Sequence, residues 1–342
     1  MRVLRLFGML GLSFSLFATP AMAESGEEVN LYSARIEALI KPMLDRFTEQ
    51  TGIQVNLVTG NADELLSRLQ NEGRNSPADL LLTTDAGRLH RAQQADLVQS
   101  VESDLLSQRI PSAYRDPDGQ WFGLSLRARP IMYVKGEVDP AELSTYEDLA
   151  DPRWDQQICI RSSGNIYNQS LVASLIDAHG IEATEQWAKG LVSNLAKPPR
   201  GGDRDQIKAA AAGQCKLAIA NTYYLAGMLN SDDAAEREAA AKMGVFWPNQ
   251  ADRGTHVNIS GAAVTKAAKN RDNAIKLMEF LTSDEAQRWY AEVNGEYPVV
   301  AGVVSSDLLQ QWGEFKADPL NMAILGENNT EALRLMDRAG WQ

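Results

Sequence analysis

The sequence predicts an α/β protein with two lobes. In the first part of the chain, short apolar stretches alternate with segments whose apolar side chains recur every three or four positions, as strands and helices do in a doubly wound sheet. The 342 residues exceed the usual size of a single hydrophobic core, and 44% of them are apolar. Because no low-complexity linker separates two halves, we expect lobes that exchange strands rather than lobes on a flexible tether.

The N-terminus has the features of a secretory signal peptide. Arg2 and Arg5 flank the start of an apolar stretch that has no charge over residues 6–18, and Ala21-Met22-Ala23 forms a small-residue cleavage site. This apolar stretch is too short to span a bilayer. We therefore expect residues 1–23 to be removed and the rest of the chain to be exported.

Composition narrows the class of partner and the redox compartment. The chain has 45 acidic and 33 basic residues, for a net charge of −12. Because phosphate backbones bind basic surfaces, we expect no nucleic-acid partner. Cys159 and Cys215, the two cysteines, each lie in an apolar, strand-like stretch. In an oxidising compartment such a pair favours a disulfide, and two separate buried thiols are the alternative.

The first part of the chain alternates regularly between strands and helices. The expected strands cover residues 29–32, 53–58 and 78–82. A helix follows each strand: the first has apolar residues at helical spacing over 39–47, Asn61 can cap the second, and the third begins near Asp85. Pro42 conflicts with the first of these helices unless it lies in its first turn.

The pattern changes after residue 120, where the stretch 127–133 predicts a strand that leaves the first lobe. Further strands are expected at 158–161, 217–220, 245–248 and 254–264, helices at 167–176, 207–212, 232–242, 273–281 and 283–293, and an extended segment at 297–299. We place the first lobe in residues 24–126 plus 255–302, and the second in residues 127–254 plus 303–342.

Three tyrosines lie just beyond the predicted ends of two strands. Tyr223 and Tyr224 follow the strand 217–220, and Tyr167 follows the strand 158–161. In an open α/β sheet, ligands bind at the carboxyl ends of strands. Tyrosine binds metal only as phenolate, so neighbouring phenolates suit a hard, highly charged cation. The alternative is that one member of the pair packs beneath a helix and the other lies on the surface.

The sequence has no motif typical of an enzyme. It lacks a nucleophile elbow, a phosphate-binding loop, a zinc-binding HExxH sequence and a dinucleotide fingerprint. An exported hydrolase is an alternative, but it requires a nucleophile–base pair that His90, His179 and His256 do not indicate. We therefore expect a binding protein rather than an enzyme.

A set of short segments, in order along almost the whole chain, resembles one family. The segments are Leu31-Tyr32-Ser33-Ala34-Arg35, 77–80, 84–87, 127–129, 161–168, 221–224, 254–261 and 297–299. Together they are similar to the periplasmic ferric-ion-binding proteins, the soluble receptors of bacterial iron ABC transporters. The resemblance implies a type II periplasmic binding-protein fold, with discontinuous domains, a cleft between two α/β lobes and a hinge of crossing strands. It also implies a monomer in the periplasm that delivers its ligand to an inner-membrane ABC permease.

The resemblance assigns the metal to Tyr167, Tyr223 and Tyr224, which all belong to the expected second lobe. Three phenolates would cancel the charge of Fe³⁺, and hard oxygen donors suit a hard ion. The metal's own charge lowers the pKa of the tyrosines that bind it, so acidification should release the metal.

The expected first lobe departs from the better-known pattern of that family. Many relatives have a histidine directly after the opening motif, where this chain has Ile36 and Glu37, and others have a glutamate at the position of Thr84. Three tyrosines therefore leave coordination positions open. One branch of the family fills them with a bound anion, here carbonate or bicarbonate. Arg35 and Arg127 are the expected clamps, because a planar guanidinium group suits a bidentate anion.

Other residues are weaker candidates for the site. Tyr32, Glu37 and Asp85 could each supply a further oxygen, with helix capping as the alternative for Asp85. Arg129 is expected on the surface or in an ion pair, and His256 is expected to be structural. Within the same fold, the alternative ligand is a small organic anion or a thiamine-like solute that the arginines would hold.

Overall fold

The structure has two β-sheets, as the α/β prediction requires. This computed structural model describes residues 27–342, and the predicted signal peptide at residues 1–23 lies outside the described residues. Within the described chain, the larger sheet has the strand order β10 (Tyr297–Pro298), β4 (Phe122–Ala128), β9 (Val257–Val264), β3 (Leu80–Thr84), β1 (Glu28–Ser33) and β2 (Gln54–Thr59). The smaller sheet has the order β6 (Ile158–Cys159), β7 (Leu217–Ile219), β5 (Ile131–Val134) and β8 (Met243–Phe246).

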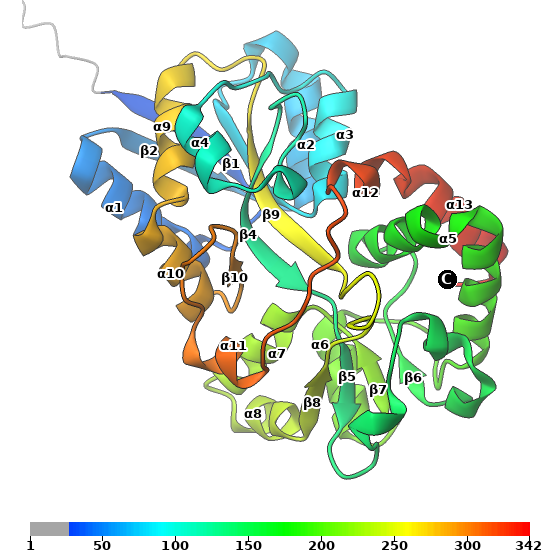
Figure 1. Cartoon of the computed structure of the whole chain (residues 1–342). Coiled ribbons are helices and arrows are strands. Elements are labelled where there is room, and N and C mark those ends of the chain that lie inside the picture. Colours follow the sequence, from blue (N-terminus) through cyan, green and yellow to red (C-terminus); the bar gives the residue numbers. More distant parts are fainter. Residues whose placement is uncertain (1–26) are drawn as a thin grey trace, which may run out of the picture.

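Helices cover both faces of the larger sheet (Figure 1). One face carries α1 (Lys41–Thr51), α4 (Asp104–Arg109), α9 (Arg271–Leu281) and α10 (Asp284–Glu292), and the other carries α2 (Ala62–Glu72) and α3 (Ala86–Gln94). The alternation of β1 explains this arrangement, because Leu31 packs into the first layer and Tyr32 into the second. Pro42 lies in the first turn of α1, so the expected conflict with the helix does not arise.

The smaller sheet has helices on both faces: α5 (Ile166–Ser193) on one, and α6 (Asp203–Ala211), α7 (Thr222–Leu229) and α8 (Ala234–Ala241) on the other. The helix α5 is much longer than the predicted segment 167–176. Gly180 interrupts it with a φ of 78°, so two helical segments join there at a kink. Short 3-10 helices cover Glu37–Leu39, Gly73–Asn75, Ser112–Tyr114, Pro140–Glu142, Glu147–Ala150 and Pro152–Trp154.

The C-terminal segment consists of α11 (Asp307–Gln311), α12 (Ala323–Glu327) and α13 (Asn329–Arg338). Figure 1 shows α13 alongside α5, and α12 contacts both α3 and α5. The end of the chain therefore touches elements on both sides of the crossing strands. The helices of residues 27–342 include none that is long and apolar enough to cross a membrane.

Two adjacent strands carry the chain between the sheets. β4 and β9 pair antiparallel as far as Ala128 opposite Val257, and the next two residues lead directly into β5 of the smaller sheet. Figure 1 shows β4 and β9 side by side along the middle of the molecule. The backbone N–H of Arg129 donates to the carbonyl of His256 at 3.1 Å, which extends the pairing past both strands. The expected hinge of crossing strands is thus present, while the lobe boundaries at 126 and 254 stay a prediction.

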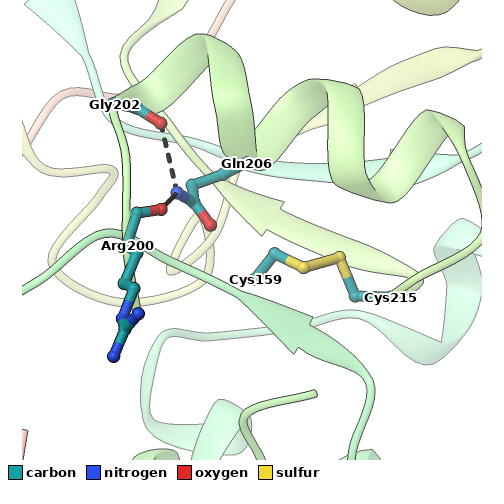
Figure 2. Close-up of a disulfide and its surroundings, with 5 residues drawn as sticks. All are labelled: Cys159, Arg200, Gly202, Gln206 and Cys215. Carbon is teal, nitrogen blue, oxygen red and sulfur yellow. Dashed lines mark hydrogen bonds between the residues drawn. A yellow bond between two sulfur atoms is a disulfide. The ribbon is translucent and has the colours of Figure 1, made fainter. Parts of the chain in front are cut away.

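The predicted disulfide is present between Cys159 and Cys215, whose Cα atoms lie 6.0 Å apart (Figure 2). Cys159 belongs to β6, and Cys215 lies two residues before β7, the parallel neighbour of β6. Figure 2 also shows Gln206 of α6, whose amide donates to the carbonyls of Arg200 at 2.7 Å and Gly202 at 3.2 Å. The disulfide therefore ties β6 to the segment just before β7, and the carboxyl ends of these two strands lead to the candidate tyrosines.

Candidate metal centre

The three tyrosines predicted from the sequence come together at the ends of β6 and β7. Tyr223 and Tyr224 lie in the first turn of α7, and their ring centroids are 4.3 Å apart. Tyr167 lies in the first turn of α5, where Asn165 caps the helix by accepting from the N–H of Tyr167 at 3.1 Å. The hydroxyl of Tyr223 donates to the hydroxyl of Tyr167 at 3.1 Å. Three phenol oxygens from two helix starts therefore face one region.

A buried arginine, Arg129, forms hydrogen bonds with residues at these helix starts. Arg129 is 1% exposed, and its Nη1 donates to Asp203 at 3.1 Å and to the side chain of Asn221 at 2.9 Å. Its Nη2 donates to the side chain of Asn168 at 2.7 Å. These partners lie at the starts of α6, α7 and α5. The expected ion pair of Arg129 is confirmed, but the alternative of a surface position is wrong because its charged partner is buried.

The environment of the tyrosine pair favours the protonated phenols in the absence of metal. Burial, followed by the neighbouring phenols of Tyr167 and Tyr224, raises the pKa of Tyr223 well above its usual range, although Arg127 opposes this effect. Burial and the charge of Tyr167 raise the pKa of Tyr224 to about 12. A cation that binds these oxygens must therefore displace protons from them.

Arg127 faces the tyrosines from the strand β4. Its guanidinium carbon lies 5.8 Å from the ring centroid of Tyr223, and its Nη2 donates to the hydroxyl of Ser260 at 2.9 Å. The side chain is 1% exposed, yet its Nε and Nη1 have no hydrogen-bond partner among the described residues. An anion would stabilise this buried guanidinium group, because it would accept hydrogen bonds from the two unpaired N–H groups.

Arg35, the other expected clamp, is already engaged in an ion pair. Its Nη2 donates to Glu296 and to the hydroxyl of Ser125, the latter at 3.1 Å, while its Nε has no partner among the described residues. The guanidinium carbon also lies 5.2 Å from the ring centroid of Tyr290. Arg35 is 7% exposed, so this pair is shielded from water.

Glu296 links the two arginines, and the sequence reasoning missed it. Its carboxylate accepts from Ser125 at 2.8 Å and from Ser260 at 3.2 Å, and its Oε1 lies 4.0 Å from Nε of Arg127. Burial by itself would raise the pKa of Glu296, but the charges of Arg35 and Arg127, with the hydrogen bonds from Arg35 and Ser125, lower it. The available signal was an acidic residue directly before the Tyr297-Pro298 segment.

The weaker candidates lie elsewhere. Tyr32 is buried, and its hydroxyl donates to Glu72 of α2 at 3.0 Å. Glu37 is exposed on a short 3-10 helix and lines a surface groove between α1 and β2. Asp85 caps α3 by accepting from the N–H of Gly87 at 2.9 Å, as its alternative role predicted. The structure gives none of the three a contact with the tyrosines.

Two further residues near the tyrosines were not in the predicted set. The guanidinium carbon of Arg161 lies 5.7 Å from the ring centroid of Tyr167, and its Nη1 lies 3.8 Å from Asp203. Ser170 of α5 donates to Asp85 at 2.7 Å, which joins an element beside the smaller sheet to one on the larger sheet. His256 is 3% exposed, and burial together with nearby arginines lowers its pKa to about 3.

Residues 42–317 match the family described as bacterial extracellular solute-binding protein. The chain belongs to this family. It is 51% identical to iron uptake protein A1 of Synechocystis over 92% of this chain and 88% of that protein. A solved Trichodesmium protein in complex with iron and citrate is 51% identical, with a TM-score of 0.90 over 92% of this chain and all of that one. A ferric binding protein of Campylobacter jejuni is 40% identical, with a TM-score of 0.87 over 92% of this chain and all of that one.

These similarities confirm the predicted resemblance to ferric-ion-binding proteins and the type II binding-protein fold. The relatives are named as uptake or binding proteins, in agreement with the prediction that this family member is not an enzyme.

Proposed function

We propose that this protein binds Fe³⁺ in the periplasm and delivers it to an inner-membrane ABC permease. The observation that carries the proposal is the hydrogen bond of 3.1 Å between the hydroxyls of Tyr223 and Tyr167, with the ring centroid of Tyr224 4.3 Å from that of Tyr223. The iron-related names of relatives that are 40–51% identical support it. The predicted signal peptide at residues 1–23 agrees with export.

The donor set suits a trivalent hard cation. Three phenolates from Tyr167, Tyr223 and Tyr224 would neutralise the charge of Fe³⁺. The described residues include no cluster of three or more histidine, cysteine, aspartate or glutamate side chains that could hold a metal. Because all three phenols lie beside the smaller sheet, iron would bind there first and the other lobe would close over it.

We further propose that an anion, carbonate or bicarbonate, completes the coordination of iron. The unpartnered Nε and Nη1 of Arg127 support a role for this residue in holding it, and the unpartnered Nε of Arg35 supports the same role. Two guanidinium groups can fix the plane of such an anion through parallel hydrogen bonds. The protein acts as a monomer in this proposal, with lobes of residues 24–126 plus 255–302 and 127–254 plus 303–342.

The test is a titration of metal-free protein with ferric ion in the presence of bicarbonate. Phenolate-to-iron charge transfer should produce a visible red to orange colour in the wild-type protein. Tyr224→Phe should lose tight iron binding and keep its fold, as judged by circular dichroism. Tyr133→Phe is the matched control, because Tyr133 lies on β5 opposite Leu217, at the end of β7 away from the tyrosine pair. A colourless ferric complex, or unchanged affinity in Tyr224→Phe, would overturn the proposal.

A small organic anion is the second candidate ligand. A Salmonella protein named as a putative 2-aminoethylphosphonate-binding protein is 25% identical over 86% of this chain. In this alternative, Arg35 and Arg127 would hold a phosphonate or carboxylate and the tyrosines would only pack against it. Calorimetry with 2-aminoethylphosphonate in the absence of iron separates the two, because tight binding without metal supports only the alternative.

A further inference from the structure

The two arginines expected to hold the anion share one buried carboxylate. Glu296 is 3% exposed, forms an ion pair with Arg35 and lies 4.0 Å from Arg127. The hydroxyls of Ser125 and Ser260 donate to its two oxygens at 2.8 and 3.2 Å. Every polar atom of this carboxylate thus has a donor from the strands that cross between the sheets.

The carboxylate changes the charge that an anion would meet. Without it, two guanidinium groups would present two positive charges, which a dianion would balance. With Glu296 included, the group of Arg35, Arg127 and Glu296 has a net charge of +1. Three tyrosinates already neutralise Fe³⁺ in the proposed site, so they leave no further positive charge for the anion to balance.

Two other buried carboxylates near the site, those of Asp85 and Asp203, have partners of their own. Asp203 lies between two arginines, 3.1 Å from Arg129 and 3.8 Å from Arg161. Asp85 directs both of its oxygens to other partners, namely the N–H of Gly87 and the side chains of Ser170 and Asn258.

We propose that Glu296 is the resident counter-ion of the anion pocket and makes the site select a singly charged anion over a doubly charged one. This inference rests on the proposed function, because it concerns the anion that completes the iron site. Arg127 then supplies two free donors to the anion, its Nε and Nη1. Arg35 supplies its Nε, because its Nη2 is bound to Glu296. Bicarbonate is the physiological anion of this charge that matches the proposed carbonate-like ligand.

The test uses metal-free full-length mature protein and two anions, bicarbonate with one negative charge and sulfate with two. Isothermal titration calorimetry at pH 7 gives the dissociation constant of each anion, and the quantity compared is the ratio of the two. Glu296→Gln should shift this ratio towards sulfate by about tenfold, because it removes one negative charge at close range in a shielded site. Arg35→Gln should shift it about tenfold in the opposite direction.

A double variant keeps the test valid if Glu296→Gln does not fold. Arg35→Gln with Glu296→Gln removes both partners of the buried pair and leaves no uncompensated charge. It should bind both anions more weakly than the wild-type protein, with an unchanged ratio. A ratio equal to that of Arg35→Gln alone would overturn the proposal, because Glu296 would then have no influence on the choice of anion.

Glu292→Gln is the matched control for total charge. Glu292 lies four residues earlier at the end of α10 and is exposed, so its loss should leave the ratio unchanged. If it shifts the ratio as Glu296→Gln does, the effect belongs to net charge and the proposal fails. Failure of the wild-type protein to bind either anion also overturns it. The proposed function is judged separately, by the colour of the ferric complex.

Discussion

Arg129 and Asp203 form an ion pair of 3.1 Å in which both side chains are shielded from water, directly beneath the three candidate tyrosines. Arg129 directly follows β4, and Asp203 is the first residue of α6. The same guanidinium group also binds Asn168 and Asn221, one residue after Tyr167 and two residues before Tyr223. The pair therefore sets the relative positions of the helix starts that carry the phenols.

We predict that Arg129→Met lowers the free energy of unfolding by about 3 kcal/mol, because it leaves the buried Asp203 without its hydrogen-bonded arginine and with Arg161 only at 3.8 Å. Urea denaturation followed by circular dichroism measures this change. The control is Arg204→Ala. Arg204 follows Asp203 on α6 and forms a surface ion pair with Glu236 of α8, so its loss should cost about 1 kcal/mol or less. Equal, small losses in both variants would show that the buried pair has no special role in stability.

Iron binding should release protons and weaken in acid. The pKa of Tyr223 is raised well above its usual range and that of Tyr224 to about 12, so both phenols are protonated at neutral pH in the metal-free protein. Each phenol that must lose its proton contributes a factor of about ten in affinity per pH unit. The apparent affinity for Fe³⁺ should therefore fall about a hundredfold or more for each unit between pH 7 and 5.

Competition with citrate at several pH values measures this dependence, and a pH indicator in weak buffer counts the protons released. At least two protons per iron are expected after subtraction of a blank with ferric citrate alone. An affinity that does not depend on pH would mean that the phenols do not bind the metal as phenolates.

The disulfide should stabilise the fold and the site together. Cys159 and Cys215 are 56 residues apart in sequence, so loop-closure entropy predicts a loss of about 4 kcal/mol when the bond is absent. The double variant Cys159→Ser/Cys215→Ser, compared with wild type by urea denaturation, measures that loss. Iron affinity should also fall, because β6 and β7 lead to Tyr167 and to the tyrosine pair. A loss in stability below about 1 kcal/mol would contradict the entropic account.

Local patterns in the sequence were sufficient for the elements and for part of the site. The strands 29–32, 53–58 and 78–82 correspond to β1, β2 and β3. The three tyrosines were found because each follows an apolar strand, and ligands gather at such strand ends. These features depend on side chains close together in the sequence, so a single stretch contains the signal.

Features formed by distant segments could not be predicted in this way. Glu296 meets Arg35 across 261 positions and Ser125 across 171, and nothing near residue 296 indicates those partners. The burial of Arg129 was missed for the same reason, since Asp203 lies 74 positions away. A charged side chain is expected at the surface until its partner is known.

The sequence by itself thus determined the α/β class, the positions of the phenols and the two cysteines that pair. Only the tertiary structure decided how charge is distributed around those phenols. Hydrophobic periodicity is a local property, whereas the energy of a buried charge depends on every group within a few ångströms. For this reason Tyr167, Tyr223 and Tyr224 could be proposed in advance, while the carboxylate between Arg35 and Arg127 could not.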